Sequence, residues 1–262
     1  MQWNFDPVLF SIGSLSIHWY GALFAAAVLS GAHLMKRVFI KEKQDTSQLD
    51  NLLTYVVAGV VIGARLVHCL FYEPDYYLSN PLEILALWKG GLASHGGGLG
   101  AILGVFFFAK KNKMSFMSLL DRITLPTALF GVFVRSANFL NSEIVGAESE
   151  LPWAIVFERV DNLARHPAQL YEALAYLCIF ILLLSLYHKS KIKEYSGAML
   201  GLFLSLCFSA RFLIEFIKEP QASYSLGIGL NTGQLLSLPF LIFGIFLFVK
   251  AIKKEPNNKP VK

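Results

Sequence analysis

Five charged or titratable residues lie in, or at the ends of, strongly apolar stretches: Arg65, His95, Arg135, Arg211 and Glu215. Charge inside a bilayer is costly, and residues that carry it there usually have a function. Guanidinium groups bind phosphate and carboxylate groups, and an imidazole can take up a proton near neutral pH. We expect these side chains to lie at one depth near one membrane face, where they would form a site for an anion.

The elements that must position them are helices. The chain is 55% hydrophobic and has a mean hydropathy of +0.53, which exceeds the apolar share of ordinary soluble domains. Each apolar stretch approaches the ~20 residues that a helix needs to cross the hydrocarbon. We therefore predict an all-α polytopic membrane protein, with one transmembrane domain (residues 1–252) and a tail (253–262). The expected spans are 19–35, 52–70, 91–109, 118–134, 169–187, 197–217 and 235–252.

Lys and Arg residues in the connections predict the orientation. Of the 23 basic residues, sixteen fall in connections on one side and five on the other. The positive-inside rule then places the N-terminus outside and the C-terminus in the cytoplasm. The connection 135–168 would form a small periplasmic cap, and the site would face the periplasm. These loops account for the net charge of +5, so no nucleic-acid partner is expected.

A glycine run begins the third expected span, in the order Ser94-His95-Gly96-Gly97-Gly98. A helix start offers free N–H groups and the positive end of the helix dipole, and glycines there would let a phosphate approach. Small residues also let transmembrane helices pack closely, so the run has a purely structural alternative. A lone His on an apolar helix is likewise often structural, and the sequence leaves both alternatives open.

Two further clusters lie at the outer ends of spans. Arg135 is followed by Asn138 and Asn141, which is more polar than an interfacial Arg that reaches lipid phosphates would need. Arg211 and Glu215 share a helix face at i,i+4, so they could hold an anion or simply neutralise each other.

Several segments together resemble the bacterial prolipoprotein diacylglyceryl transferase family, in the order in which that family carries them. The matching segments are Trp19-Tyr20-Gly21, Gly63-Ala64-Arg65-Leu66, Ser94-His95-Gly96-Gly97-Gly98-Leu99-Gly100, Arg135 to Gly146 with its Asn-Phe-x-Asn core, Arg165-His166-Pro167-x-Gln169-Leu170-Tyr171-Glu172, Arg211-Phe212-x-x-Glu215-Phe216 and Gln234-Leu235-Leu236-Ser237-Leu238-Pro239.

The resemblance implies a transferase that moves the diacylglyceryl group of phosphatidylglycerol to the lipobox Cys of a preprolipoprotein signal peptide. A thioether forms and glycerol phosphate leaves. Phosphatidylglycerol, the preprolipoprotein and membrane lipids would be the partners, and neither a metal nor a cofactor is expected. The predicted catalytic residues are His95, Arg135, Arg211, Glu215 and Tyr20. The predicted substrate-binding residues are Asn138, Gly96, Gly97, Gly98, Gly146, Arg65 and Asn141.

In this hypothesis Arg135 and Arg211 hold the phosphate, because fixed cations stabilise the charge that develops on a leaving group. The thiol must lose its proton to become the nucleophile. His95 is the first choice of base and Glu215 the second. Tyr20 and Asn138 would position headgroup or ester oxygens. A transporter of an anionic substrate is the alternative function, but its ligands would be expected near the membrane midplane rather than at one rim.

Overall fold

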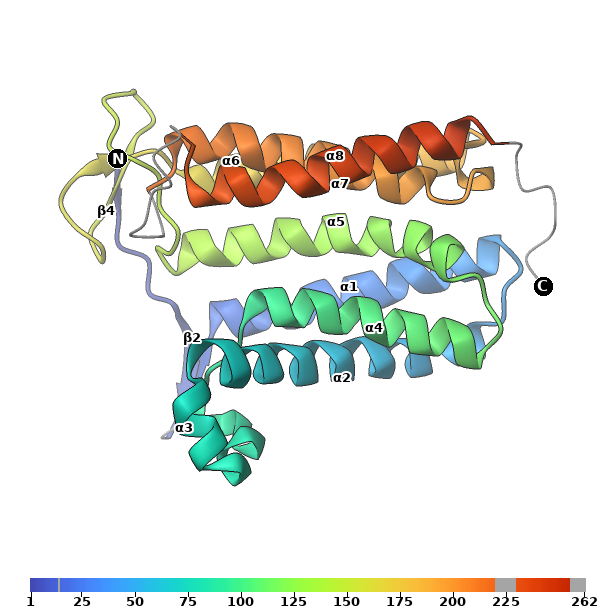
Figure 1. Ribbon diagram of the computed structural model, residues 1–262. Coiled ribbons are helices and arrows are strands. Elements are labelled where there is room, and N and C mark those ends of the chain that lie inside the picture. Colours follow the sequence, from blue (N-terminus) through green and yellow to red (C-terminus); the bar gives the residue numbers. More distant parts are fainter. Residues whose placement is uncertain (14, 220–229, 255–262) are drawn as a thin grey trace. The chain divides into compact units, whose positions relative to one another are not determined.

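The computed structural model describes residues 1–13, 15–219 and 230–254, and it is mostly helical (Figure 1). The chain forms two compact units. Unit 1 comprises Met1–Met35 and the chain from Asp121 onward, and unit 2 comprises Lys36–Leu120. Among the described residues, each of the seven predicted spans overlaps a helix. The predicted C-terminal tail lies almost wholly outside the described residues.

Unit 1 contains most of α1 (Trp19–Lys41) and α5 (Phe116–Leu140), together with α6 (Ala168–Lys189), α7 (Ala198–Ile214) and α8 (Thr232–Ile252). Helices α7 and α8 pack closely and lie side by side in Figure 1. Glycine permits this approach, because a Cβ on Gly201 would lie 2.5 Å from the Phe248 backbone nitrogen. In membranes no hydrophobic effect brings helices together, and small residues allow the close contacts that stabilise a helix pair.

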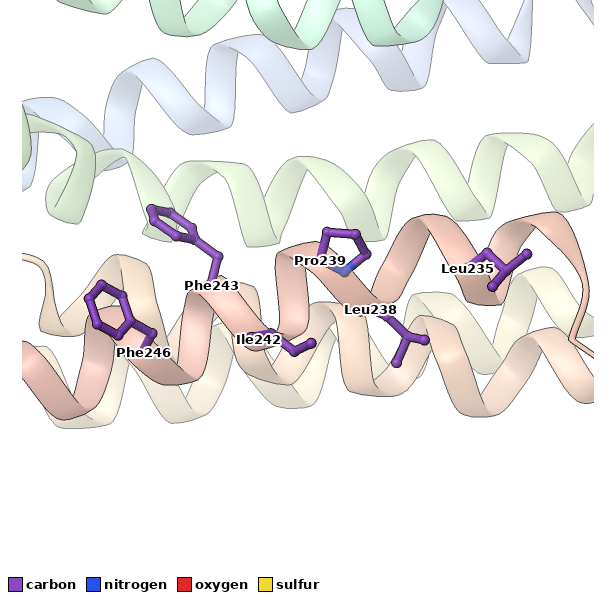
Figure 2. Close-up of a pocket in the computed structure, with 6 residues that line it drawn as sticks. All are labelled: Leu235, Leu238, Pro239, Ile242, Phe243 and Phe246. Carbon is purple, nitrogen blue, oxygen red and sulfur yellow. The ribbon is translucent and has the colours of Figure 1, made fainter.

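The side of α8 that faces away from α7 carries apolar side chains along the middle of the helix. A shallow pocket there is lined by Leu235, Leu238, Pro239, Ile242, Phe243 and Phe246, which follow one stripe of the helix (Figure 2). This composition is what a helix face in contact with lipid tails requires.

Short strands, which an all-helical prediction did not include, form at one end of unit 1. Strands β1 (Gln2–Trp3), β4 (Ile155–Phe157) and β5 (Ala164–Arg165) make a sheet in the order β1-β4-β5, in which β1 pairs with β4 in parallel and β4 with β5 antiparallel. Trp3 packs with Phe139 and Phe157 beneath it. Strands β2 (Val8–Ile12) and β3 (Leu15–His18) form a hairpin. The segment predicted as a cap is therefore folded around a small core.

Unit 2 contains α2 (Leu49–Val67), a π-type turn (His68–Tyr72), α3 (Pro74–Ser79), two 3₁₀ turns (Pro81–Leu85 and Leu87–Lys89) and α4 (Ser94–Lys111). Helices α2 and α4 pack closely. We call residues 73–91, between the π-type turn and α4, the arm. Its surface carries exposed apolar side chains, which are Tyr76, Leu78, Leu82, Leu85, Leu87 and Trp88.

Six helical stretches are long and apolar enough to cross a membrane: Trp19–Lys41, Thr46–Tyr72, Phe116–Leu140, Ala168–Lys189, Ala198–Ile217 and Thr232–Ile252. The prediction of a polytopic helical membrane protein is therefore confirmed. Helix α4, the remaining predicted span, has 18 residues and is not among the six. It starts at Ser94 rather than 91 because Gly90 and Gly91 adopt positive φ angles of 81° and 76°, which a helix does not accept.

Candidate active site

The last two turns of α5 begin a polar network in unit 1. Helix α5 extends to Leu140, beyond the predicted end at 134, so Arg135 and Asn138 lie on the helix rather than past it. One Arg135 terminal nitrogen donates to Asn138 Oδ1 at 3.3 Å, and Asn138 Nδ2 donates to Glu143 Oε2 at 3.0 Å. Asn141 donates to the other Glu143 oxygen at 3.2 Å. The predicted binding residues Asn138 and Asn141 thus share one carboxylate and face Arg135.

Glu172, near the start of α6, connects this network to the end of α7. Arg135 Nε lies 2.8 Å from Glu172 Oε2, and Lys218 Nζ lies 3.4 Å from Glu172 Oε1. The side chains of Glu172 and Lys218 are each only 2% exposed. Buried charges need partners of this kind, because an unpaired ion would be strongly penalised. Glu172 therefore fixes two cations from different segments.

Arg211 belongs to the same end of unit 1. It is half-buried, and its side chain makes no hydrogen bond or ion pair with another described residue. The ion pair with Glu215 that the i,i+4 spacing allows is not formed. The guanidinium of Arg211 therefore has no anionic partner among the described side chains.

Glu215 lies in the 3₁₀ turn after α7 and is 6% exposed. Its Oε2 is 3.6 Å from Lys218 Nζ. Its carboxylate lies against Gly233 in the first turn of α8, where a Cβ would be only 2.7 Å from Oε2. The α8 start carries a capping box, in which Asn231 and Gln234 each accept a hydrogen bond from the other's backbone N–H. A carboxylate is favoured at this position by the helix dipole.

Gly146 lies in a strip of backbone pairing, formed by residues 146–147 with His166 and with 217–218, that holds Lys218 in place. Its N–H donates to the His166 carbonyl, and it forms an antiparallel bridge with Lys218. A Cβ on Gly146 would lie 2.5 Å from His166 O and 2.9 Å from Ile217 O. The close backbone packing at this position therefore requires glycine.

Arg165 reinforces this strip from the cap. It donates to the Gly146 carbonyl at 3.2 Å and forms ion pairs with Asp161 and Glu219. Its hydrogen bonds to Asp161 hold the pKa of that carboxyl below its usual value, and the Leu163 N–H adds to the effect. The same partners raise the pKa of Arg165, the hydrogen bond to Asp161 being the main cause. The segment carrying Lys218 is thus fixed from two sides.

In unit 2, the structure uses Arg65 to hold the arm. Its Nε donates to Ile84 O at 2.8 Å, and its terminal nitrogens donate to the carbonyls of Glu83, Ala86, Gly90 and Gly91. The guanidinium also lies 5.0 Å from the Tyr77 ring centroid. A guanidinium has five N–H donors, and five carbonyls use them. We therefore assign Arg65 to the architecture of the arm, although its residue type suggested a phosphate ligand.

His95 and the glycine run occupy the first turns of α4. His95, Gly98 and Leu99 are exposed along one side of the helix. On the other side, a Cβ on Gly96 would collide with the Gly63 carbonyl of α2, whereas one on Gly98 would meet nothing within 4 Å. Gly97 is in ordinary contact distance of α2, with Val60 Cγ1 at 3.5 Å from such a Cβ. Packing on α2 therefore explains Gly96, and open space beside His95 remains only at Gly98.

Tyr20 lies in the first turn of α1 in unit 1, where it is half-buried and its hydroxyl makes no hydrogen bond with another described residue. The predicted site residues therefore divide between the units. Arg135, Asn138, Asn141, Gly146, Arg211, Glu215 and Tyr20 belong to unit 1, and Arg65, His95, Gly96, Gly97 and Gly98 belong to unit 2. Within the described chain, no three His, Cys, Asp or Glu side chains gather as metal ligands.

Comparison with known proteins decides the family. Residues 7–250 match the family model described as prolipoprotein diacylglyceryl transferase. The chain belongs to this family. A relative from Tolumonas auensis is 50% identical over 97% of the chain and 98% of its own length. Relatives from Chloroherpeton thalassium and Porphyromonas gingivalis are 46% and 41% identical, over at least 96% of each chain. All three are named phosphatidylglycerol–prolipoprotein diacylglyceryl transferase, so the resemblance found in the sequence is confirmed.

Three residues of the unit 1 network were not among the predicted site residues: Glu143, Glu172 and Lys218. Glu172 could have been found, because an acidic residue three positions after Gln169 near the start of an apolar span is costly unless it is paired. Lys218 follows the apolar span directly, and its sequence position is equally typical of an exposed, membrane-flanking lysine. Only the backbone pairing with Gly146 turns it inward.

Proposed function

We propose that this protein transfers the diacylglyceryl group of phosphatidylglycerol to the lipobox Cys thiol of preprolipoproteins. The match with the family over residues 7–250 and the names of its relatives support this activity. The reaction forms a thioether and releases glycerol phosphate, and it would be the first step of lipoprotein maturation.

The membrane arrangement that we propose has seven spans, with α4 as the additional one. The N-terminus and the 135–168 connection lie on the periplasmic side of the bacterial inner membrane, and the C-terminus lies in the cytoplasm. The distribution of Lys and Arg residues supports this orientation. The reaction then takes place at the periplasmic end of the helices, where Arg135, Glu172 and Glu215 lie.

The chemical step is a displacement at the glyceryl carbon that carries the phosphate. The thiol gives its proton to a base, and the thiolate sulfur forms a bond to this carbon. The carbon–oxygen bond to phosphate breaks, and its electron pair stays with the departing glycerol phosphate. The leaving group therefore gains one negative charge. Cations fixed near its oxygens lower the barrier, because they stabilise the transition state more than the ground state.

The observation that carries this proposal is the polar network around Arg135, in which Glu172 and Asn138 hold its guanidinium at this end of unit 1. Glu172 orients Arg135, and Arg211 has no anionic partner among the described residues. We assign the direct phosphate contact to Arg211, with Arg135 supplying the N–H groups that Glu172 and Asn138 leave available. Tyr20 and Asn138 would position headgroup or ester oxygens.

We assign the thiol proton to His95, with Glu215 as the alternative base. His95 is exposed on α4 beside the open side of Gly98, where a peptide could reach it. Glu215 is buried and lies 3.6 Å from Lys218, so its carboxylate already has a nearby cation. The proposal requires that His95 and Arg211 act on the same substrate.

The test is a reconstituted assay with phosphatidylglycerol vesicles and a lipobox peptide. Arg211→Ala is expected to lower turnover about 10²–10³-fold, the usual effect of removing one donor to a developing oxyanion. Arg159→Ala, an exposed arginine of the cap, is the matched control and should keep its rate. Equal rates for Arg211→Ala and wild type would refute the phosphate contact. A transporter would release no glycerol phosphate from the wild-type protein.

A further inference from the structure

Seven buried side-chain atoms lack hydrogen-bond partners in the described part of the chain, and two of them belong to residues that meet at the start of α8. These two are the carboxylate oxygen Oε2 of Glu215 and the amide nitrogen Nε2 of Gln234. The two residues are 6% and 2% exposed. Buried polar groups are almost always satisfied, and each exception calls for an explanation. One of these atoms is an acceptor and the other a donor, so together they match a ligand that can do both.

The two side chains belong to one small structure at the start of α8. The Glu215 carboxylate lies against Gly233, the residue before Gln234. Asn231 Nδ2 donates to the Glu215 carbonyl at 3.1 Å, and Gln234 Oε1 accepts from the Asn231 N–H at 3.0 Å. The capping box therefore uses the oxygen of the Gln234 amide and leaves its nitrogen unused. Lys218 Nζ, at 3.6 Å, stays beyond hydrogen-bond distance of Glu215 Oε2.

Arg211 lies in the last turn of α7 and Glu215 in the turn that follows it, so the pair belongs to the same end of unit 1 as the proposed phosphate contact. We propose that Glu215 Oε2 and Gln234 Nε2 bind the two hydroxyl groups of the glycerol headgroup and so select phosphatidylglycerol among membrane lipids. This inference rests on the proposed function. A hydroxyl can donate to Glu215 and accept from Gln234, so a diol satisfies both atoms, whereas an alkyl headgroup satisfies neither.

Sites built in this way discriminate strongly. A buried group that must pair with a substrate hydroxyl rejects an analogue without it, because the group is then left unpaired. The assignment gives Glu215 a binding role in the ground state, which is compatible with His95 as the base. It also explains why an amide, and not only a carboxylate, lies at this position: a carboxylate pair would accept a cationic headgroup equally well.

The test compares donor lipids with identical acyl chains in the reconstituted full-length protein. Phosphatidylglycerol and phosphatidylpropanol differ only in the two hydroxyls. Wild type should prefer phosphatidylglycerol about 10²-fold or more in kcat/KM. Gln234→Glu keeps the oxygen that caps Asn231, because Glu also serves in a capping box, but it replaces the donor by an acceptor. The variant should lose at least tenfold of this preference while its kcat/KM for phosphatidylpropanol changes little.

Thr232→Asp is the matched control. It adds the same charge to the first turn of α8 and keeps the hydrogen bonds of Asn231, including the one to the Glu215 carbonyl, so its preference should equal that of wild type. An equal preference in Gln234→Glu and wild type would overturn the inference, as would an equal loss in both variants.

Phosphatidylethylene glycol, with one hydroxyl, gives a second measurement that needs no variant. Wild type should use it at an intermediate rate, and a rate equal to that for phosphatidylpropanol would also contradict the pairing. If wild type released glycerol phosphate from no donor, the proposed function itself would fail, and that outcome is separate from a lost preference.

Discussion

Neutralising Glu172 should weaken both the fold of unit 1 and its activity. Its carboxylate lies 2.8 Å from Arg135 Nε and 3.4 Å from Lys218 Nζ, and it is 2% exposed. Glu172→Gln keeps the shape of the side chain but leaves two buried cations without their shared anion. Removing one partner of a buried ion pair typically costs about 3–5 kcal/mol. At 2–4 °C per kcal/mol for a chain of this size, we expect the melting temperature to fall by roughly 6–20 °C.

The activity loss has a separate cause. Arg135 loses the partner that orients its Nε, and misplacing a catalytic group by about 1 Å can cost 10²-fold in rate. Turnover of Glu172→Gln should therefore fall about tenfold to a hundredfold at a temperature where the variant remains folded. Thermal unfolding of the purified protein in detergent and the lipobox-peptide assay measure the two effects independently.

A double-mutant cycle distinguishes the network from a local effect. Adding Lys218→Met to Glu172→Gln removes a buried cation that has lost one of its two carboxylates, so the double variant should be less destabilised than the sum of the single ones. Coupling energies between contacting residues are typically 0.5–3 kcal/mol. Glu158→Gln, in an exposed part of the cap, is the matched control. Wild-type stability of Glu172→Gln, or strict additivity with Lys218→Met, would refute the bridging role.

Three further predictions test other parts of the structure. Gly100→Ala should destabilise the α2–α4 pair, because its Cβ would collide with an α2 carbonyl, whereas Gly98→Ala meets open space; equal melting temperatures for the two variants would contradict this packing. Arg65→Lys should lower stability by about 2–5 kcal/mol, since lysine leaves buried carbonyls of the arm unpaired, and limited proteolysis should then cut the arm faster. Arg165 lowers the pKa of Asp161. The pair therefore stabilises the fold fully above the unfolded pKa of about 3.9, and this stabilisation is lost as the pH falls through the lower pKa of the folded state. Asp161→Asn should therefore flatten the loss of stability below about pH 4, as measured by unfolding across pH.

Helices and their order could be predicted because apolar runs of this length have few other structures available in a membrane. The small sheet of the cap could not, since β1 and β5 have only two residues each and depend on partners distant in the chain. Two predicted helix boundaries, the start of α4 and the end of α5, were wrong for local reasons. Positive φ at Gly91 delays α4, and the side-chain pairing of Arg135 with Asn138 continues α5 past the expected end.

The sequence indicated residue types for the candidate site but not the partners of each side chain. The spacing of Arg211 and Glu215 allowed a pair between them, yet the turn after α7 directs Glu215 toward Lys218 and Gly233. For Arg65 the sequence suggested a functional role that the hydrogen bonds of its side chain do not require. Its position in an apolar span indicated function, but its five acceptors are backbone carbonyls of the arm, which no sequence pattern reveals.

We propose that His95 and Arg211 act on one lipid. If both touch the same reacting group at about 3 Å, the two side chains must approach within roughly 10 Å of each other. Cysteines placed at the two positions, in a background without the three native cysteines, can be tested with a short bifunctional thiol reagent in native membranes. We predict a rapid cross-link for this pair and none between His95→Cys and Lys253→Cys, at the far end of α8. Failure of the first pair to cross-link, with both thiols shown to react singly, would contradict the account.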